Sequence, residues 1–469
     1  MSDYIYMLES HLSPDQNRVV EDVQAAAVQA NVNVFLTGGA MRDMLAGLRI
    51  RDLDFAIEGK ALKVAQAVCE RAGAKTTSVD DNRKAAELVF PSGVTAQIGM
   101  SRQEKYGRGG GKPQVTPATI QDDLRRRDFT CNAIALSLNQ ASRGLLLDPM
   151  NGLADIQRHE LRAVSPYGFY DDPSRLLRLI RFRVRLGFTV EERTQMQVAN
   201  AREAEVEKSI PARALGEELK RIGAEDNPAE ILKAVEEAGL ASLFLPAGAG
   251  KFNVAGVARL EKMARLLPDD HRSRAARFGP LLFALTEKMT PKEKQALVKA
   301  TDLGKADVDQ WQKLEARSKK LETALRSARI RKASQVYHIV AAAAPDELLF
   351  LLYHSALKPV QERLKNHFQK YLPAVQEVTP EEWAALEGKP GTPRYNKSRD
   401  EFITNLLDNR PPKKREPPPM PGGAPDAPPV PGGPPPASPA AGAAAAQGGA
   451  PAAPAASAAG TPARGRKGN

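Results

Sequence analysis

Short apolar runs alternate with helical patterns along the first 150 residues of the chain. The runs are bounded by Gly, Pro and polar residues, and their lengths suit strands, whereas the segments between them carry apolar residues at helical spacing. The predicted strands lie in VNVFLTGG (32–39), DLDFAI (52–57), AAELVF (85–90) and IALSL (134–138). This mixture predicts an α/β or α+β domain.

From about residue 155 to residue 410 the pattern is helical almost throughout. Leu176, Ile180 and Val184 fall on one helical face, and similar spacing recurs in LLFALTEKM, VYHIVAAAA and LLFLLYHSA. No fixed-period repeat is present, so we expect an elongated all-helical body. Near Arg410 the composition changes to Pro, Ala and Gly with almost no large apolar side chains. Such a segment predicts a disordered C-terminal tail.

Composition and charge narrow the class of protein. The chain has 469 residues, of which 42% are hydrophobic, and its 67 Lys and Arg exceed its 56 Asp and Glu to give a net charge of +11. This surplus favours polyanions such as nucleic acid or nucleotides. The two cysteines imply no disulfide framework. The start of the chain lacks a signal-peptide pattern, and no run reaches 18 apolar residues, so we expect a cytoplasmic protein without membrane contact.

The stretch GGAMRDMLAGLRIRDLDF (38–55) carries the first candidate chemistry. Gly38 and Gly39 lie between a predicted strand and a predicted helix over 41–48. There the missing Cβ lets the backbone approach a ligand, and the N–H groups of the helix start point at an anion. Arg42, one turn into the helix, can add a phosphate contact. A tight turn that simply needs glycine remains the alternative.

The same stretch ends in two aspartates on a predicted strand. If Leu53, Phe55 and Ile57 face a core, a period of two places Asp52 and Asp54 together on the opposite face. Paired carboxylates can bridge two divalent cations, and hard oxygen ligands suit Mg²⁺. The alternative is a strand edge whose acids face water. The upstream glycine turn favours the nucleotide site.

A third segment, DDPSRLLRLIRFRVRLGF (171–188), combines a helix start with many arginines. Asp172 suits an N-cap position and Pro173 the first helical position. The helix that follows carries arginines at 175, 178, 181, 183 and 185. Their spacing predicts a basic stripe above a buried apolar face.

Together with RRDFTCNA (126–133) and LLDPMNGLADI (146–156), these segments resemble the ordered motifs of class II nucleotidyltransferases, the tRNA CCA-adding enzymes and bacterial poly(A) polymerases. The resemblance implies an α+β chain with an N-terminal, polymerase β-like nucleotidyltransferase sheet domain and a helical body. It further implies a catalytic head over 1–155, a nucleotide-selecting and RNA-binding neck over 156–270, a tRNA-binding body over 271–409 and the tail over 410–469.

The resemblance also implies roles for individual residues. Asp52 and Asp54 would bind the catalytic Mg²⁺ ions, Asp172 and Arg175 would read the base edge of CTP or ATP, and Asp128 and Asn132 would favour a ribose. The residues implied in nucleotide binding are Gly38, Gly39, Arg42, Arg127, Asp128, Asn132, Asp172, Arg175, Arg178 and Arg181. Of these, Gly39, Arg42, Arg127, Arg178 and Arg181 would contact phosphates.

The expected function is a template-independent, Mg²⁺-dependent nucleotidyltransferase that builds or repairs the 3′-CCA end of tRNA without an obligate protein partner. A poly(A) polymerase, or the A-adding enzyme of a split CCA system, shares every motif quoted. A noncatalytic RNA-binding or nucleotide-binding protein on the same scaffold is the alternative from another class.

Some positions depart from the family pattern. Asp171 stands where a Glu is common, Gln97 stands where many members have an acid, and Arg213 and Glu217 match a later helix motif only loosely. No His-Asp dipeptide occurs in the sequence, so the phosphohydrolase domain of some relatives is not expected. The segment RQEKYGRGGGKPQVTP (102–117) reads as a mobile basic loop. CCA-adding members have a flexible loop there, which disfavours a CC-only enzyme.

Overall fold

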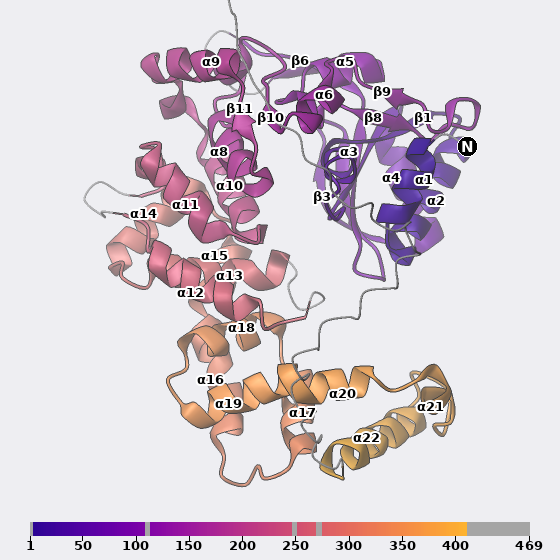
Figure 1. Ribbon diagram of the computed structural model, residues 1–469, viewed down its shortest axis with the longest axis vertical. Coiled ribbons are helices and arrows are strands. Elements are labelled where there is room, and N and C mark those ends of the chain that lie inside the picture. Colours follow the sequence, from indigo (N-terminus) through magenta and orange to yellow (C-terminus); the bar gives the residue numbers. More distant parts are fainter. Residues whose placement is uncertain (1–2, 108–112, 246–250, 269–273, 410–469) are drawn as a thin grey trace, which may run out of the picture. The chain divides into compact units, whose positions relative to one another are not determined.

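A computed structural model describes residues 3–107, 113–245, 251–268 and 274–409. Residues 1–410 cluster as one unit, and the tail predicted over 410–469 lies outside the described residues. The α+β class is confirmed, since a mixed sheet near the N-terminus is followed by helices (Figure 1). The division of the unit into head, neck and body at residues 155 and 270 stays a prediction.

The sheet has seven strands in the order β3-β4-β5-β2-β1-β8-β9. β2 and β5 are parallel, and the other neighbours are antiparallel. The strands are β1 (Asn33–Thr37), β2 (Leu53–Glu58), β3 (Lys75–Asp80), β4 (Ala85–Val89), β5 (Thr95–Met100), β8 (Ala135–Ser137) and β9 (Leu146–Leu147). The four strands predicted from the sequence are therefore confirmed. β3 was not predicted because its sequence, KTTSVD, is polar and almost wholly exposed.

The two faces of the sheet differ in how much apolar cover they have. Helices α2 (Pro14–Gln29) and α4 (Ala61–Ala72) pack on the face that buries Phe55 and Ile57 (Figure 1). α2 begins with Ser13 and Gln16 in a capping box. On the opposite face a smaller core joins Ala56 to the short helix α5 (Ile120–Arg125). The apolar cover thus reaches Ala56, two residues beyond Asp54 on the same face.

Helices make up most of the remainder, as predicted. The other helices are α1 (Asp3–His11), α3 (Gly38–Leu45), α6 (Gly152–Gln157), α7 (Gly168–Asp171), α8 (Arg175–Leu186), α9 (Glu192–Glu203), α10 (Ala212–Ala224), α11 (Pro228–Glu237), α12 (Val254–Ala264), α13 (Arg274–Thr286), α14 (Pro291–Thr301), α15 (Lys305–Gln312), α16 (Leu314–Arg326), α17 (Ala333–Ala341), α18 (Pro345–His354), α19 (Lys358–Asn366), α20 (Leu372–Gln376), α21 (Pro380–Ala384) and α22 (Pro393–Asp408). The all-helical prediction fails at one point, because β10 (Glu160–Leu161) pairs with β11 (Thr189–Val190).

Helix lengths bear on the expectation that the protein makes no membrane contact. Within the described ranges no single helix has the length and apolar composition of a membrane span, although the bent pair of α17 and α18 would meet that test together. α18 is largely buried in the protein core, with Leu348, Phe350 and Leu352 each at most 2% exposed.

Candidate active site

The glycine pair lies where β1 passes directly into α3, and it touches the acidic pair. Gly38 has a φ of +67°, and a Cβ there would lie 2.9 Å from Asp54 Oδ2. Glycine is therefore needed both for the left-handed backbone and for the close approach. The N–H of Gly39 donates to Asp54 Oδ2 at 3.3 Å. The predicted turn between strand and helix is confirmed, with the helix beginning at Gly38 rather than Met41.

Asp54 lies in β2 and Asp52 directly precedes this strand, and both lie on the face opposite the main core, as predicted. Leu53, Phe55 and Ile57 are at most 3% exposed, whereas Asp52 and Asp54 are half-buried. Thr95 on β5 donates to Asp52 Oδ1 at 3.1 Å. Asp52 is therefore held by β5, whereas Asp54 contacts the glycine pair.

The surroundings of Asp54 disfavour its negative charge, and a bound cation would offset this effect. Burial raises the pKa of Asp54 above its ordinary value and the charge of Asp52 raises it further, while Arg127 and the Gly39 N–H act in the opposite direction. A divalent cation would favour the charged form of both carboxylates. No group of three or more metal-ligating side chains occurs among the described residues. Two carboxylates plus substrate phosphates are a usual Mg²⁺ ligand set, so the residues present fit the ion.

Gln97 is the direct neighbour of Asp54 in the sheet. The parallel register of β2 and β5 pairs Asp54 with Gln97, which is exposed. The position aligned with the family's additional acid therefore does lie beside the predicted metal ligands. Its amide brings no charge to the site.

Arg127 lies over the glycine turn. Its Nη2 donates to Thr37 Oγ1 at 3.0 Å and to Asp123 Oδ2 at 2.9 Å, and its Nη1 donates to the carbonyl of Asn132 at 3.1 Å. A Cβ on Gly38 would lie 3.1 Å from Arg127 Nη1. Asp123, which the sequence analysis did not single out, thus orients this arginine toward the turn.

Four of the predicted nucleotide-binding residues form one continuous chain of hydrogen bonds. Arg42 Nη1 donates to Asn132 Oδ1 at 2.7 Å, and Asn132 Nδ2 donates to Asp128 Oδ1 at 2.9 Å. Arg178 Nε on α8 then donates to Asp128 Oδ2 at 2.8 Å. Burial alone would raise the pKa of Asp128, but Arg178 and the hydrogen bond from Asn132 hold it well below its usual range. This series of hydrogen bonds connects Arg42 in α3 to Arg178 in α8.

Arg42 is also held by its own neighbour. Its Nε and Nη2 donate to Asp43 Oδ1 at 2.9 and 2.7 Å, and both side chains are only 3% exposed. The edge of this guanidinium also lies close to the glycine turn, since a Cβ on Gly39 would lie 3.6 Å from Arg42 Nη2.

Asp172 and Arg175 lie at the entrance to α8. Arg175 Nη2 donates to the carbonyl of Arg126 at 2.9 Å and Nη1 to that of Arg127 at 3.3 Å, which ties α8 to the RRRD segment. Asp172 was predicted to cap the helix, but α8 begins at Arg175 with Ser174 as its N-cap. Asp172 instead accepts from the N–H and hydroxyl of Ser174, because the intervening proline and serine form a separate turn.

Gly168 makes room for the guanidinium of Arg175. A Cβ at Gly168, the first residue of α7, would lie 2.9 Å from Arg175 Nη1. Asp172 keeps a third of its side chain exposed, whereas Arg175 is 9% exposed. Of the two residues predicted to read the base, Asp172 is partly exposed to solvent, and Arg175 is held by the carbonyls of Arg126 and Arg127.

The predicted basic stripe on α8 is wrong. Arg181 is buried and donates to Glu218 Oε1 at 2.6 Å and to Glu225 Oε1 at 3.0 Å, while Arg185 donates to Asp43 Oδ2 at 2.6 Å. Carboxylates distant in sequence thus neutralise arginines that the spacing alone would leave in water. Arg42, Arg178 and Arg181 lie around the ring of Phe182, with each Cζ within 5.4 Å of its centroid, so Arg181 lies near two predicted phosphate ligands while it donates to acids. Its principal partner, Glu218, is the neighbour of Glu217, which the sequence analysis had singled out.

The segment over 102–117 is not a loop throughout. β6 (Arg102–Lys105) pairs with β7 (Gln114–Pro117) as an antiparallel ribbon, while residues 108–112, which include most of its glycines, lie outside the described residues. Arg126 Nη2 and Arg102 N both donate to Asp123 Oδ1, at 2.5 and 3.1 Å. The ribbon is therefore fixed at its base to α5.

Comparison with known proteins agrees with these motifs. Residues 34–162 match the family model described as the poly A polymerase head domain. An A-adding tRNA nucleotidyltransferase of Geobacter sulfurreducens is 30% identical over 244 residues, which are 52% of this chain and 28% of that protein. A multifunctional CCA protein of Alkalilimnicola ehrlichii is 33% identical over 226 residues, 46% of this chain and 50% of that protein.

The chain thus spans no more than about half the length of these relatives. Among solved structures, a CCA-adding enzyme in its second apo form aligns with 87% of this chain and 95% of its own, at 23% identity and a TM-score of 0.49.

Proposed function

We propose that this chain, which carries a poly A polymerase head domain over residues 34–162, is a template-independent RNA nucleotidyltransferase that adds or repairs the 3′-CCA end of tRNA from CTP and ATP. The observation that carries the proposal is the hydrogen-bonded chain from Arg42 in α3 to Arg178 in α8, through Asn132 and Asp128. Residues assigned to phosphate and ribose thereby lie next to the helix assigned to the base.

Asp52 and Asp54 would hold Mg²⁺. When bound there, the metal would neutralise the triphosphate and activate the 3′-hydroxyl of the RNA for attack on the α-phosphorus, with pyrophosphate as the leaving group. Gly38 and Gly39 let the carboxylate of Asp54 and the guanidinium of Arg127 lie close to the backbone of the turn, where a triphosphate would meet both. In this proposal the protein supplies the charged side chains around the triphosphate, and the glycine pair lets them lie close to the backbone.

Asp172 and Arg175 would select the nucleotide. A carboxylate accepts a hydrogen bond from the exocyclic amino group of cytosine or adenine, and a guanidinium donates to a ring nitrogen or carbonyl. U and G offer the wrong pattern to this pair. Because Arg175 is anchored to the carbonyls of Arg126 and Arg127, its remaining donor capacity has a defined direction.

The A-adding enzyme of a split system is the second candidate, and the name of the Geobacter relative favours it. A direct test offers the purified protein three tRNA transcripts that end in the discriminator base, C or CC, with CTP and ATP supplied separately. A CCA-adding enzyme incorporates C on the first two and A on the third. Incorporation of A alone would establish the A-adding activity, and long A tracts would establish a poly(A) polymerase.

A noncatalytic protein on the same scaffold would extend none of these substrates. The matched control is the double variant Asp52→Asn with Asp54→Asn, which preserves side-chain size. We expect it to bind tRNA but to extend none, and we expect EDTA to abolish extension by the unaltered protein until Mg²⁺ is restored. Extension by the double variant would overturn the metal assignment.

A further inference from the structure

Glu225 is a buried carboxylate that contacts three arginines. It follows directly after α10, and its side chain is 5% exposed. Its Oε2 lies 2.7 Å from Arg51 Nη1 and 3.5 Å from Arg185 Nε, and its Oε1 lies 3.0 Å from Arg181 Nη1. A carboxylate at this position takes part in ion pairs with two different regions of the chain at once.

Each arginine belongs to an element that carries proposed site residues. Arg51 is the residue immediately before Asp52, at the end of the segment that joins α3 to β2. Arg181 and Arg185 lie on α8, the helix that begins at Arg175. Glu225 therefore connects the strand end of the metal site with the helix that carries the base-reading arginine.

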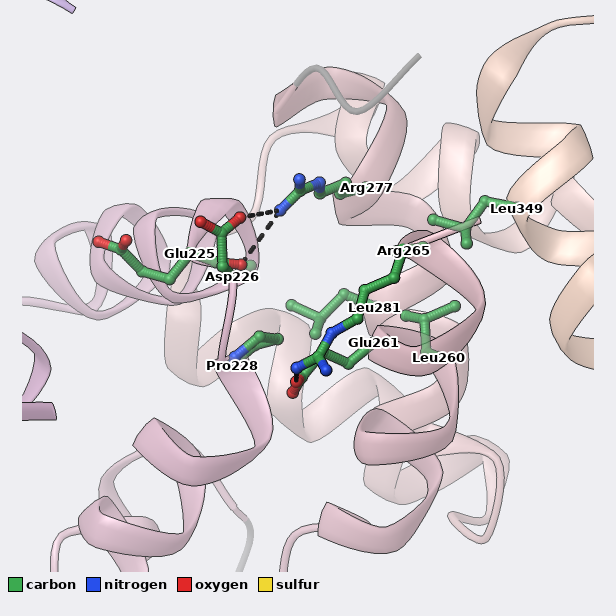
Figure 2. Close-up of a pocket in the computed structure, with 11 residues that line it drawn as sticks. Glu225, Asp226, Pro228, Leu260, Glu261, Arg265, Arg277, Leu281 and Leu349 are labelled. Carbon is green, nitrogen blue, oxygen red and sulfur yellow. Dashed lines mark hydrogen bonds and ion pairs between the residues drawn. The ribbon is translucent and has the colours of Figure 1, made fainter. Parts of the chain in front are cut away.

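The backbone around Glu225 is fixed independently of its side chain. Arg277 Nη1 on α13 donates to the carbonyl of Glu225 at 3.1 Å and lies 3.5 Å from Asp226 Oδ1 (Figure 2). The same residues line one side of a cavity of about 370 Å³, with Leu260 and Leu281 among its apolar walls. Glu225 is thus the C-cap residue of α10, and its backbone carbonyl is tied to α13.

Charge balance explains why the acid is tolerated there. Burial opposes ionisation of Glu225, but Arg185, Arg181 and Arg51 together hold its pKa below the ordinary value. A buried charge that loses a partner is costly, and removing Glu225 would leave Arg51 with Asp226, Arg181 with Glu218 and Arg185 with Asp43 as their remaining acidic partners. We expect the three arginines to make other contacts in the absence of Glu225, and we expect α8 and the segment before β2 to shift as a result.

We propose that Glu225 is a positioning residue that sets the spacing between the metal-binding end of β2 and the base-reading end of α8. The inference rests on the proposed nucleotidyltransferase function and adds a residue from beyond the matched head domain to its machinery. Nucleotidyl transfer needs the base, the α-phosphorus and the 3′-hydroxyl aligned at once, and displacements of about 1 Å can cost about 100-fold in rate.

The test compares Glu225→Gln with Glu237→Gln in α11, which removes an acid that is 61% exposed and pairs with Lys233. We measure kcat and KM for the correct nucleotide, misincorporation of UTP and GTP, and thermal unfolding of each variant. For Glu225→Gln we expect kcat to fall about 10- to 100-fold and discrimination to weaken, with KM changed less than about threefold. Glu225→Asp should recover part of kcat. Glu237→Gln should behave like the unaltered protein.

Arg51→Met provides a second variant should Glu225→Gln fail to fold, because Arg51 is 32% exposed. It should reproduce the loss of kcat, and combining both changes should cost less than the product of the single effects. Lower thermal stability with unchanged kcat and discrimination, or strictly multiplicative effects, would overturn the inference. If the unaltered protein extends no RNA, the proposed function fails instead.

Discussion

Asp54 and Asp128 lie in the same domain, yet their surroundings shift their pKa values in opposite directions. Asp54 is desolvated and lies beside Asp52, and its pKa is raised. Asp128 is more deeply buried, but Arg178 and Asn132 donate hydrogen bonds to it, and its pKa is lowered. At Asp54 the nearby positive charges do not outweigh burial and the charge of Asp52. At Asp128 the contacts with Arg178 and Asn132 do outweigh burial.

The acidic side chains of the protein therefore have two different roles. Asp128, Glu218 and Glu225 are counter-ions for arginines, and their charges stabilise the packing between elements. Within the described residues, the recorded hydrogen bond to the carboxylate of Asp54 comes from the N–H of Gly39, which suits the proposed role of Asp54 as a cation ligand. The feature that distinguishes the proposed metal site is therefore that the arginines near Asp54 do not compensate its burial and the charge of Asp52.

The largest effect that this comparison predicts is on catalysis at Asp54. Asp54→Asn should slow nucleotide incorporation by about 1,000-fold or more, because half of the proposed metal ligation is lost. Without Mg²⁺ its thermal stability should equal or exceed that of the unaltered protein, since the charge removed is one that burial disfavours. Asp81→Asn, in an exposed turn, is the control and should leave both quantities unchanged. A large loss of stability in Asp54→Asn would contradict the comparison.

Asp128→Ala should show the reverse pattern, with a stability loss as its main effect. It would leave Arg178, which is 24% exposed, without its counter-charge, and we expect the free energy of unfolding to fall by about 3 kcal/mol. Urea denaturation measures this change. Asp128→Asn keeps an acceptor for Asn132 and should lose less. A change in unfolding free energy below about 0.5 kcal/mol would show that the ion pair is not stabilising.

The two acids should also give opposite pH dependences. The folded pKa of Asp128 lies below its unfolded value of about 3.9, so its stabilisation is fully present above about pH 5 and is lost as the pH falls through and below 4. The difference in melting temperature between the unaltered protein and Asp128→Asn should therefore shrink in acid. For Asp54→Asn, the unaltered protein should gain relative stability as the pH falls. Parallel curves for both variants would refute the assignment.

The smallest predicted effect concerns Gly168. In Gly168→Ala the new methyl group would press on Arg175, so we expect discrimination against UTP and GTP to fall about 3- to 10-fold while the free energy of unfolding changes by less than about 1 kcal/mol. Competition assays with mixed nucleotides measure the ratio. Gly279→Ala in α13, where a Cβ meets nothing closer than 3.7 Å, is the matched control. Equal discrimination in both variants would remove Arg175 from base selection.

The local part of the site was predictable from sequence, because local rules determine it. Alternation of apolar residues placed Asp52 and Asp54 on one face of β2, and the glycine pair marked the turn into α3. The resemblance supplied the order of the motifs and the residues assigned to the base. The contact of Gly39 with Asp54 follows from these pieces once the strands pair.

The partners of the α8 arginines were not predictable in this way. Glu218 is 37 residues from Arg181, and Asp43 is 142 residues from Arg185. No periodicity spans such separations, so the spacing of arginines alone suggested a solvated stripe. Likewise, the start of α8 depends on a turn at Pro173 and Ser174 that competes with the simpler capping pattern.

The internal pairing of α8 has a consequence for how the protein meets RNA. Arginines whose charges are balanced by Asp128, Glu218, Glu225 and Asp43 displace no condensed counterions from a phosphate backbone. They therefore add nothing to the slope of log affinity against log salt concentration. The net charge of +11 measures the composition of the whole chain, and the salt sensitivity of tRNA binding will report only the basic residues that reach the surface.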